Sequence, residues 1–362
     1  MLKLFRKPER VATLLPQGTT LPVKGGQRLL DAALAQGLNW PHDCRVGSCG
    51  TCRCLLREGK VKSLTDLAYT LGIEDIRAGA VLACQALLKS DVVVEIELDQ
   101  QAAEVETVEG RIASLTPLTH DIVEVAISLP RPAFCGARAG QYLEVTAAGL
   151  EAPRSYSFAR DPVHADQVSF VIRHVPGGLF TDWLFSGDRR GETLSLRGPC
   201  GSFGRGTGGG RIVCVAGGSG IAPVHAILEA ALREEISRPC IILFGVRTQA
   251  DIFFRQELER IQQQWRASFE IIPVLSEEPA QSVWAGARGT VVTDMKRLIG
   301  PPAPGDEAYL CGPPAMVDAA LTELAQLGFR PEMIFFDKFL DASTYPDGRR
   351  LPGAGRLPRP LP

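Results

Sequence analysis

The stretch HDCRVGSCGTC, residues 42–52, holds three cysteines in the spacing Cys-x4-Cys-x2-Cys, and Cys84 follows downstream. Four thiolates in this arrangement are typical of a [2Fe–2S] cluster. Gly47 and Gly50 give the loop the backbone freedom to fold closely around inorganic sulfide. The sequence therefore predicts a cluster site in a small strand-rich domain, with these metal ligands: Cys44, Cys49, Cys52 and Cys84.

Two other interpretations of the cysteines were weighed. Structural zinc usually takes its ligands from paired knuckles, and this pattern has only one short pair. Cys54 is a fifth thiol beside the loop, and we interpret it as a packed residue. The remaining cysteines are scattered and mostly lie in apolar strand-like runs: Cys135, Cys200, Cys214, Cys240 and Cys311. In a reducing compartment such cysteines serve as small hydrophobic residues, and we interpret all of them in this way except Cys311.

The composition excludes several classes of protein. The 362 residues are 45% hydrophobic and 22% charged, which argues against disorder, collagen and coiled coil. A net charge of −2 is too balanced for a dedicated nucleic-acid binder. No apolar run approaches the roughly 20 residues that span a bilayer, and the N-terminus lacks the apolar core of a signal peptide. We expect a cytoplasmic protein of two or three domains.

Three blocks and a tail are visible along the chain. Residues 8–100 combine alternating strands with a helix at Leu29–Gly37. In residues 104–206 short strands recur every 10–15 residues between turn signals, which predicts an antiparallel barrel. In residues 207–340 continuous apolar strands alternate with helices, which predicts a doubly wound parallel sheet. Residues 341–362 are rich in proline, and we expect this tail to be dispensable for folding.

The barrel block carries a candidate flavin site. In Arg154-Ser155-Tyr156-Ser157 the arginine can neutralise a pyrophosphate, the tyrosine can stack on an isoalloxazine ring, and Ser157 can hydrogen-bond near its N5 edge. A strand with tyrosine between polar residues is common, so this motif alone does not identify a flavin site. The glycine turn Gly177-Gly178, which opens a short helix containing Thr181, adds a second phosphate-binding element.

The third block carries a candidate nicotinamide-nucleotide site. A buried strand runs into the glycine turn Gly217-Gly218-Ser219-Gly220, and Ala222 and Pro223 follow in the first helical turn. This is not G-x-G-x-x-G, but it provides free amides for a pyrophosphate. A second strand ends at Arg247, near the expected adenosine ribose. Because we expect no further basic residue close by and Asp251 follows, we favour NADH over NADPH.

These motifs resemble known families. Residues 42–52 resemble the plant-type ferredoxin loop, as found fused to reductases. Arg154–Ser157, the turn at 176–184, Gly198–Phe203 (GPCGSF), Gly217–Pro223 and Cys311–Met316 (CGPPAM) are similar to the motifs of ferredoxin–NADP⁺ reductase-like proteins. The resemblance places Arg173 and His174 at the nucleotide half of FAD, which favours FAD over FMN. It places Cys311 and Gly312 near the nicotinamide. It also places an aromatic residue of the closing strand over the flavin, and the 23 residues beyond that strand leave open whether this is Phe336 or Phe339.

The order of cluster, flavin and nicotinamide motifs is that of reductase components of bacterial multicomponent oxygenases, such as the benzoate dioxygenase and methane monooxygenase types. The resemblance implies a β-grasp ferredoxin domain, an FAD barrel and an NAD domain. Electrons would pass from NADH through FAD and the [2Fe–2S] cluster to a terminal oxygenase or an intermediary ferredoxin. We expect a monomer without nucleic-acid partner or membrane span. The implied catalytic residues are Tyr156, Ser157 and Cys311, and the implied cofactor-binding residues are Arg154, Ser155, Tyr156, Ser157, Arg173, His174, Gly177, Gly178, Thr181, Gly217, Gly218, Gly220, Ala222, Pro223, Arg247, Cys311, Gly312, Phe336 and Phe339.

Two alternative functions remain at this stage. One is a free-standing flavin reductase with a small-molecule acceptor, which the fused ferredoxin domain argues against. The other is a non-enzymatic redox sensor, which the intact flavin and nucleotide motifs disfavour. Arg45 and Arg53 are candidates for a positive patch around the cluster, and charges on a solvated loop are the alternative interpretation.

Overall fold

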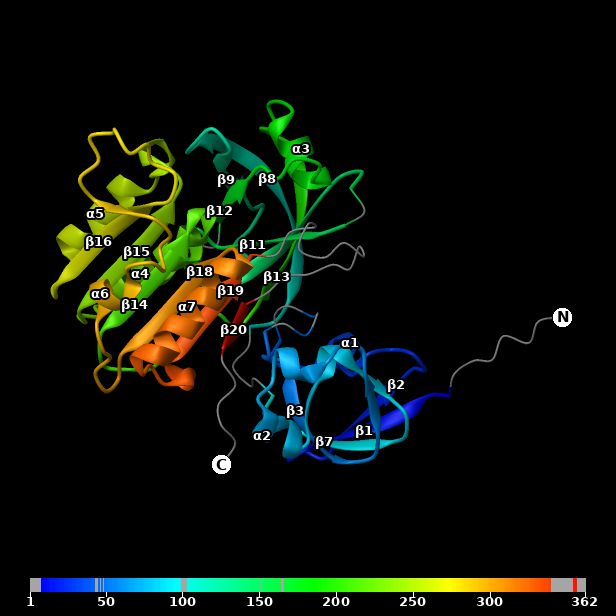
Figure 1. The fold of residues 1–362 in the computed structure, drawn as a ribbon. Helices are drawn as coiled ribbons and strands as arrows, with labels where there is room; N and C mark the ends of the chain where they lie inside the picture. Colours follow the sequence, from blue (N-terminus) through cyan, green and yellow to red (C-terminus); the bar gives the residue numbers. More distant parts are fainter. Residues whose placement is uncertain are drawn as a thin grey trace. The chain divides into compact units, whose positions relative to one another are not determined.

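A computed structural model describes residues 8–42, 45, 47, 49–98, 103–150, 152–163, 166–339 and the backbone of 354–356 (Figure 1). The chain divides into two compact units, Met1–Ala102 with Gly353–Pro362, and Ala103–Pro352. Each unit is described by itself. Most of the predicted tail lies outside the described residues, which include only the short strand β20 (Ala354–Arg356) from that segment.

The first unit is built on a mixed sheet with the strand order β2-β1-β7-β3-β5. The β1–β2 hairpin is antiparallel, whereas β1 pairs with β7 in parallel, the arrangement of a β-grasp fold. The strands are β1 (Arg10–Leu15), β2 (Thr19–Val23), β3 (Arg53–Glu58), β5 (Ala80–Leu82) and β7 (Val92–Glu95), with a separate pair of β4 (Val61–Ser63) and β6 (Ala86–Leu88).

Helix α1 (Leu29–Ala35) covers this sheet with its buried residues Leu29, Leu30 and Ala33. The sequence predicts the helix to run to Gly37, but it ends at Ala35. Gly37 has φ 72°, a left-handed conformation that stops helices and that glycine adopts without strain. The second helix of the unit, α2 (Ile73–Arg77), is a single short turn.

The second unit begins with the predicted antiparallel barrel. Its sheet has the order β11-β10-β13-β8-β9-β12, and a bridge between Phe158 and Phe170 brings its two outer strands together. Phe158, Phe170 and Leu196 are among the fully buried residues inside. The elements are β8 (Glu106–Pro117), β9 (Ile122–Ser128), β10 (Tyr142–Ala147), β11 (Arg154–Ser157), β12 (Gln167–Arg173), α3 (Leu179–Phe185) and β13 (Thr193–Cys200).

A parallel sheet follows, with the order β17-β16-β15-β14-β18-β19. The chain moves outward from β14 in one direction and then returns to the other side of β14 at β18. In doubly wound sheets, ligands bind at the carboxyl ends of the strands beside such a switch point. The strands are β14 (Ile212–Gly217), β15 (Cys240–Val246), β16 (Phe269–Leu275), β17 (Ala287–Arg288), β18 (Glu307–Gly312) and β19 (Ile334–Lys338).

Helices flank this sheet (Figure 1). Helices α4 (Ile221–Arg233) and α5 (Arg255–Gln264) pack against each other, as do α6 (Met295–Ile299) and α7 (Pro314–Leu327). Helix α4 is buried along most of its length, because one side covers the sheet and residues near its C-terminal end meet the barrel. Among the described residues, no helix is long and apolar enough to cross a membrane.

Hydrogen bonds and ion pairs join α4 to the barrel, among them an ion pair between Glu229 and Arg160 at 3.7 Å. The His225 ring is fully buried, and its Nδ1 lies 2.9 Å from the carbonyl oxygen of Ala159. Burial, reinforced by the nearby charge of Arg160, lowers the pKa of His225 to about 4, so the ring is neutral and Nδ1–H donates. Arg233 pairs with Asp161 at 2.6 Å, and the Asp161 amide donates to Glu229.

The segment Gly206–Gly210, between barrel and parallel sheet, is fixed by the fully buried carboxylate of Glu307. That carboxylate accepts from the Gly208 amide at 2.6 Å, from Arg238 at 2.7 Å and from the Tyr309 hydroxyl at 2.8 Å. A Cβ on Gly206 would lie 2.2 Å from a Glu307 oxygen. The glycines therefore let the backbone approach this buried group.

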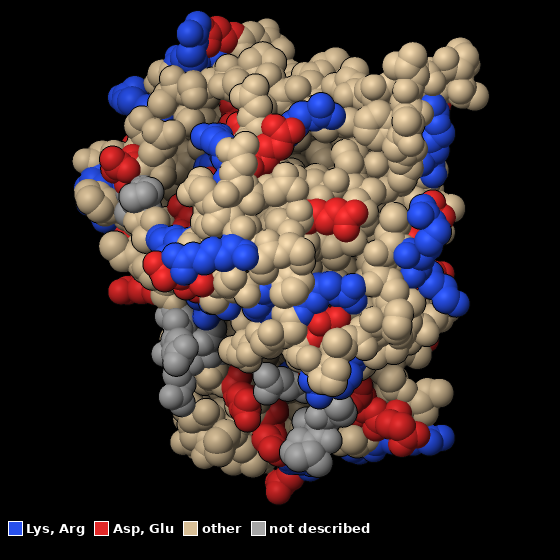
Figure 2. Space-filling view, turned by 90° about the vertical axis from the view of Figure 1, so that its left-hand side faces the viewer, with Lys and Arg blue, Asp and Glu red and all other residues tan. Residues whose placement is uncertain are grey.

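The surface mixes charges of both signs. On the face shown in Figure 2, Lys and Arg side chains lie beside Asp and Glu side chains. This distribution agrees with the balanced composition of 39 basic and 41 acidic residues.

Candidate functional site

In the first unit, the structure brings two predicted cluster ligands together. Cys84 lies in the short turn η2 (Ala83–Gln85), and its amide donates to the sulfur of Cys52 with a separation of 3.5 Å. Cys49 is buried in the loop that connects α1 to β3. Cys44 lies outside the described residues. Amide hydrogen bonds to cysteine sulfur are among the groups that tune iron–sulfur centres.

The loop that holds these cysteines depends on its glycines. Gly47 and Gly50 have φ of 87° and 78°. A Cβ on Gly47 would lie 2.8 Å from the Gln85 side chain, so only glycine fits there. Gln85 is a contact that sequence reasoning missed: its amide donates to the Arg45 carbonyl at 3.2 Å and to the Cys84 sulfur at 3.5 Å. It therefore ties the loop to the remote ligand.

Cys54 and Arg53 are structural residues. Cys54 packs in the core of the unit, and burial, followed by the charge of Cys52, raises the pKa of its thiol far above the usual range. It is a neutral packed thiol, as interpreted from the sequence. Arg53 pairs with Asp75 at 2.7 Å, and its side chain is only 10% exposed. The hypothesis that Arg53 contributes to a positive surface patch is therefore wrong.

In the second unit, Arg154-Ser155-Tyr156-Ser157 forms strand β11 at the end of the barrel sheet, paired with β10. The guanidinium of Arg154 donates to the carbonyls of Ala152 and Pro153 and has no carboxylate partner among the described residues. Its positive charge is thus available to a phosphate. Tyr156 packs against Phe180 with ring centroids 5.4 Å apart, and burial raises the pKa of its hydroxyl.

The other predicted flavin residues form a turn with internal contacts. The Thr181 hydroxyl bonds to the backbone of Val175, and His174 bonds to Asp182 at 2.8 Å. Gly177 has φ 80° and open space where a side chain would stand. Arg173 donates to Asp121 at 3.2 Å. The residue set fits a dinucleotide, since the Arg154 guanidinium, which has no carboxylate partner in the described part of the chain, and the open turn at Gly177 both suit phosphate groups.

Strand β19 of the parallel sheet contacts strand β11, which carries the predicted flavin residues. The Ser157 hydroxyl donates to the Asp337 carboxylate at 3.1 Å. Side chains alternate along a strand, and the Phe339 amide continues the pairing by bonding to the Gly312 carbonyl at 2.9 Å. By this alternation Phe339 shares the face of Asp337, which contacts Ser157, whereas Phe336, which is buried, lies on the opposite face.

The glycine turn after β14 is closely packed on one side and open on the other. A Cβ on Gly220 would lie 2.2 Å from the Cys311 carbonyl oxygen, and a Cβ on Gly217 would lie 2.5 Å from the Met316 sulfur. Gly218 has φ 53° and faces open space. Helix α4, with Ala222 and Pro223 in its first turn, starts without a side-chain cap. Its first amides are available to a pyrophosphate.

Cys311 is the next-to-last residue of β18, directly before Gly312 and beside this turn, and it is fully buried. Burial, followed by the charge of Asp337, raises the pKa of its thiol well above the usual range. The thiol is therefore neutral and does not act as a thiolate nucleophile.

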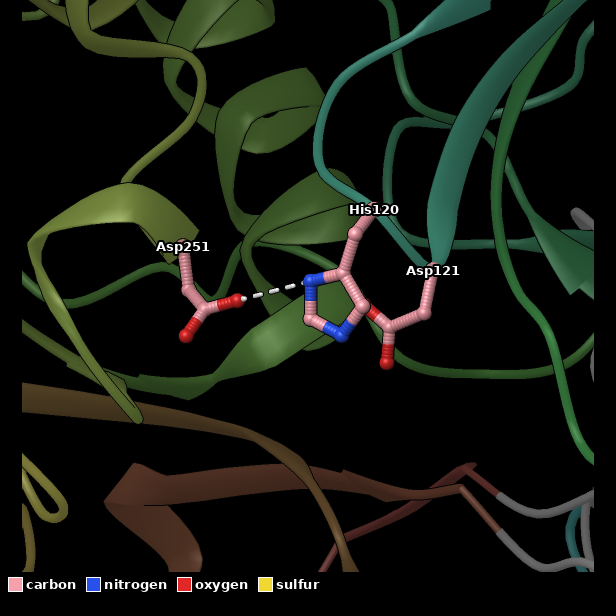
Figure 3. A group of neighbouring side chains, drawn as sticks. All are labelled: His120, Asp121 and Asp251. Atoms are coloured by element: carbon pink, nitrogen blue, oxygen red, sulfur yellow. Dashed lines mark ion pairs between the residues drawn. The ribbon is translucent and has the colours of Figure 1, made fainter.

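Arg247 has partners that the sequence did not reveal. Its Nη2 atom donates to Asp121 at 2.9 Å and to Asp251 at 3.0 Å. The His120 ring lies near the same two carboxylates (Figure 3). Its Nε2 atom is 3.9 Å from Asp121 and its Nδ1 atom is 3.6 Å from Asp251. The expectation that no other basic residue is close is wrong, because folding brings Arg173 and His120 from the barrel. Asp121, His120 and Asp251 have metal-ligating side chains, but both carboxylates already accept from Arg247.

Comparisons with known proteins agree with this division of sites. A 2Fe-2S iron-sulfur cluster binding domain matches residues 12–89, an oxidoreductase FAD-binding domain matches 109–204, and an oxidoreductase NAD-binding domain matches 214–322. Fold and sites together thus define an NAD(P)H-dependent oxidoreductase that carries FAD and a [2Fe–2S] cluster.

The chain is 43% identical over 336 residues to the xylene/toluene monooxygenase electron transfer component XylA of Pseudomonas putida, covering 92% of this chain and 94% of the relative. It is 32% identical to the naphthalene 1,2-dioxygenase ferredoxin–NAD(P)⁺ reductase component of Pseudomonas putida, covering 92% and 98%. The solved Amycolatopsis cytochrome P450 reductase GcoB is 30% identical with a TM-score of 0.76, covering 92% and 99%. The protein belongs to the family of three-domain reductase components of oxygenase systems.

Proposed function

We propose that the protein takes electrons from NADH in preference to NADPH and delivers them one at a time to the terminal oxygenase of a multicomponent system, directly or through an intermediary ferredoxin. The relatives named above are components of such systems. FAD would supply the conversion between a two-electron donor and a one-electron cluster. The observation that carries the proposal is the Ser157–Asp337 contact, which joins the flavin strand to the nicotinamide sheet.

We propose the following roles for individual residues. Cys44, Cys49, Cys52 and Cys84 hold the cluster. Arg154 neutralises the FAD pyrophosphate, together with the turn at Gly177 and Gly178, while Arg173 and His174 lie toward its nucleotide half. Tyr156 offers its ring to the isoalloxazine, and Ser157, held by Asp337, presents its hydroxyl at the reacting edge. Of the two aromatic candidates, we assign the cover of the flavin to Phe339, because Phe336 is on the far face of the sheet.

At the nicotinamide side, Gly217, Gly218 and Gly220 with the first amides of α4 hold the coenzyme pyrophosphate. The neutral Cys311 and Gly312 lie at the switch point, where the nicotinamide ring would be placed between the two domains. The close approach of Gly220 to the Cys311 carbonyl packs the glycine turn directly against the end of β18.

We propose domain limits of 8–100, 104–206 and 207–340, a monomer in solution, and a cytoplasmic location. The free cysteines of the structure and an NADH-dependent activity suit a reducing compartment. Size-exclusion chromatography with light scattering tests the monomer.

The test of the function is reconstitution. Anaerobic addition of NADH should bleach first the flavin and then the cluster absorbance. Adding an oxygenase component from the same host should reoxidise the cluster and give hydroxylated product. Rapid flavin reoxidation by a small-molecule acceptor with no transfer to any oxygenase would favour the free-standing flavin reductase. Absence of NADH oxidation with every acceptor would favour a redox sensor.

A further inference from the structure

Gln85 directly follows the remote cluster ligand Cys84 and is almost fully buried, with 3% of its surface exposed. Its backbone is fixed on both sides, because the turn η2 ends at Gln85 and strand β6 begins at the next residue. The Gln85 carbonyl also accepts from the Leu64 amide at 2.9 Å. A buried side chain on a fixed backbone has little freedom, so its contacts are a built feature of the cysteine site.

The side-chain amide of Gln85 serves two acceptors. Its Nε2 atom lies 3.2 Å from the Arg45 carbonyl oxygen and 3.5 Å from the Cys84 sulfur. A carbonyl oxygen can only accept a hydrogen bond, so the atom of Gln85 that faces it is the NH2 nitrogen and not the amide oxygen. The two hydrogens of one NH2 group therefore serve one backbone carbonyl and one sulfur.

The Arg45 carbonyl has a second donor. Arg45 has φ 57°, a left-handed conformation that non-glycine residues adopt where contacts fix it. Arg28 donates to the same carbonyl at 3.1 Å and also forms an ion pair with Asp31 at 2.6 Å. If the Gln85 amide were removed, the loop would keep the Arg28 anchor, whereas the Cys84 sulfur would lose its donor from Gln85.

These donors fit an iron–sulfur centre. The Cys84 amide donates to the Cys52 sulfur at 3.5 Å, and Gln85 donates to the Cys84 sulfur. N–H groups directed at ligand sulfurs stabilise the negative charge of the thiolates in such a centre. Reduction adds one electron and makes the sulfurs stronger acceptors, so each N–H stabilises the reduced state more than the oxidised state. No bond forms or breaks at Gln85 in this step.

We propose that Gln85 raises the reduction potential of the [2Fe–2S] cluster through its hydrogen bond to the Cys84 sulfur, and so favours the passage of an electron from the flavin to the cluster. The proposal rests on Cys84 being a cluster ligand, as stated under the proposed function. Gln85 acts through this ligand and is a positioning residue for the electron-transfer reaction.

The test is Gln85→Met in the holoprotein, because methionine fills a similar volume but has no side-chain N–H. A redox titration followed by electron paramagnetic resonance measures the midpoint potential of the cluster. The equilibrium constant for cluster reduction should fall about fivefold, the scale of one hydrogen bond. This lowers the midpoint potential by about 40 mV, since a tenfold change is about 59 mV for one electron. Iron, acid-labile sulfide and the flavin potential should match the wild type.

Arg28→Lys is the matched control. It keeps the positive charge and changes the other donor to the Arg45 carbonyl, but it leaves the Gln85 donor to the Cys84 sulfur in place. The midpoint potential should therefore stay at the wild-type value. An equal shift in Arg28→Lys would show that the position of the loop sets the potential, and the proposal would be refuted.

The remaining outcomes separate the proposal from its premise. Wild-type protein that holds zinc and no acid-labile sulfide would refute the assignment of Cys84 as a cluster ligand. A normal cluster with an unchanged or higher potential in Gln85→Met would refute the role of Gln85 alone. Gln85→Leu repeats the loss of the N–H with a different shape and should lower the potential as well. If neither Gln85 variant holds a cluster, Gln85 is a structural residue and the proposal fails.

Discussion

The hydroxyl of Ser157 lies 3.1 Å from a carboxylate oxygen of Asp337, although 180 residues separate them in the chain. Ser157 ends the flavin strand β11, and Asp337 belongs to β19 of the parallel sheet. A buried hydroxyl with a carboxylate acceptor has one preferred rotamer, because other rotamers leave the carboxylate without this donor. The nucleotide domain therefore sets the orientation of a side chain in the flavin domain.

This contact makes Ser157→Ala a variant with a defined effect. We expect FAD content near that of the wild type and a rate of flavin reduction by NADH that is lower by about tenfold or more, the scale of one hydrogen bond at a reacting group. Stopped-flow absorbance measures the rate. Ser195→Ala, a half-buried serine on β13 of the same barrel, is the control. An unchanged rate in Ser157→Ala would remove this residue from the reacting edge.

Cys84→Ser should separate the two halves of the electron path. It removes the remote cluster ligand from the first unit, while the second unit has a core of its own. We expect loss or impairment of the [2Fe–2S] signal, retained FAD, and retained reduction of a dye that accepts from the flavin. Electron delivery to the oxygenase should collapse. Iron and acid-labile sulfide analysis with electron paramagnetic resonance follows the cluster. Wild-type oxygenase turnover without a cluster would show that electrons leave directly from FAD.

His225 should make the second unit sensitive to acid. Its native pKa of about 4 is below the ordinary value near 6.5, so between these values the unfolded chain binds a proton that the folded chain does not. The free energy of unfolding should therefore fall, by up to about 3 kcal/mol, as the pH drops from 6.5 to 4. Thermal unfolding followed by release of flavin fluorescence measures this loss. His225→Gln can still donate to Ala159 but does not titrate, so it should lose less stability over that range. If the wild type and His225→Gln lost equal amounts of unfolding free energy, His225 would not be the group that titrates.

Glu307→Ala should destabilise the second unit strongly. It leaves Arg238 buried without its carboxylate and removes the acceptor of the Gly208 amide. Loss of one partner of a buried pair costs about 3–5 kcal/mol. Chemical denaturation followed by tryptophan fluorescence measures the change. Glu259→Ala, on the exposed side of α5, should stay within about 0.5 kcal/mol of the wild type. If Glu307→Ala lowered the free energy of unfolding by less than about 1 kcal/mol, water would be replacing the carboxylate as the partner of Arg238 and of the Gly208 amide.

What the sequence predicted well is local. The cluster spacing and the turn Gly217–Gly220 are encoded in adjacent residues, because each loop must fold tightly over a few positions. The antiparallel barrel and the doubly wound sheet likewise follow from strand and helix periodicity, whereas the β-grasp fold of the first domain was implied by the resemblance of residues 42–52 to the plant-type ferredoxin loop. These predictions needed no knowledge of which distant segments meet.

The features that the sequence could not predict depend on contacts between segments that are far apart in the chain. The partners of Arg247 include Asp121, which no local pattern marks, because the hairpin and the strand end come together only when barrel and sheet pack. Glu307 is an acidic residue in a strand that otherwise looks like its neighbours. The proposal that Phe339 rather than Phe336 covers the flavin required knowing which face of β19 lies toward β11. That information came only from the contact of Asp337 with Ser157.

The anchored glycine segment has a consequence for protein engineering. Natural modules are usually exchanged by cutting at glycine-rich stretches, and Gly206–Gly210 looks like a suitable place in the sequence. A new sequence there would place side chains against the carboxylate of Glu307 and leave that carboxylate short of a donor. Chimaeras that give this reductase a different electron outlet should therefore be joined at the boundary between the two units, with the flavin and nicotinamide domains transferred as one cassette.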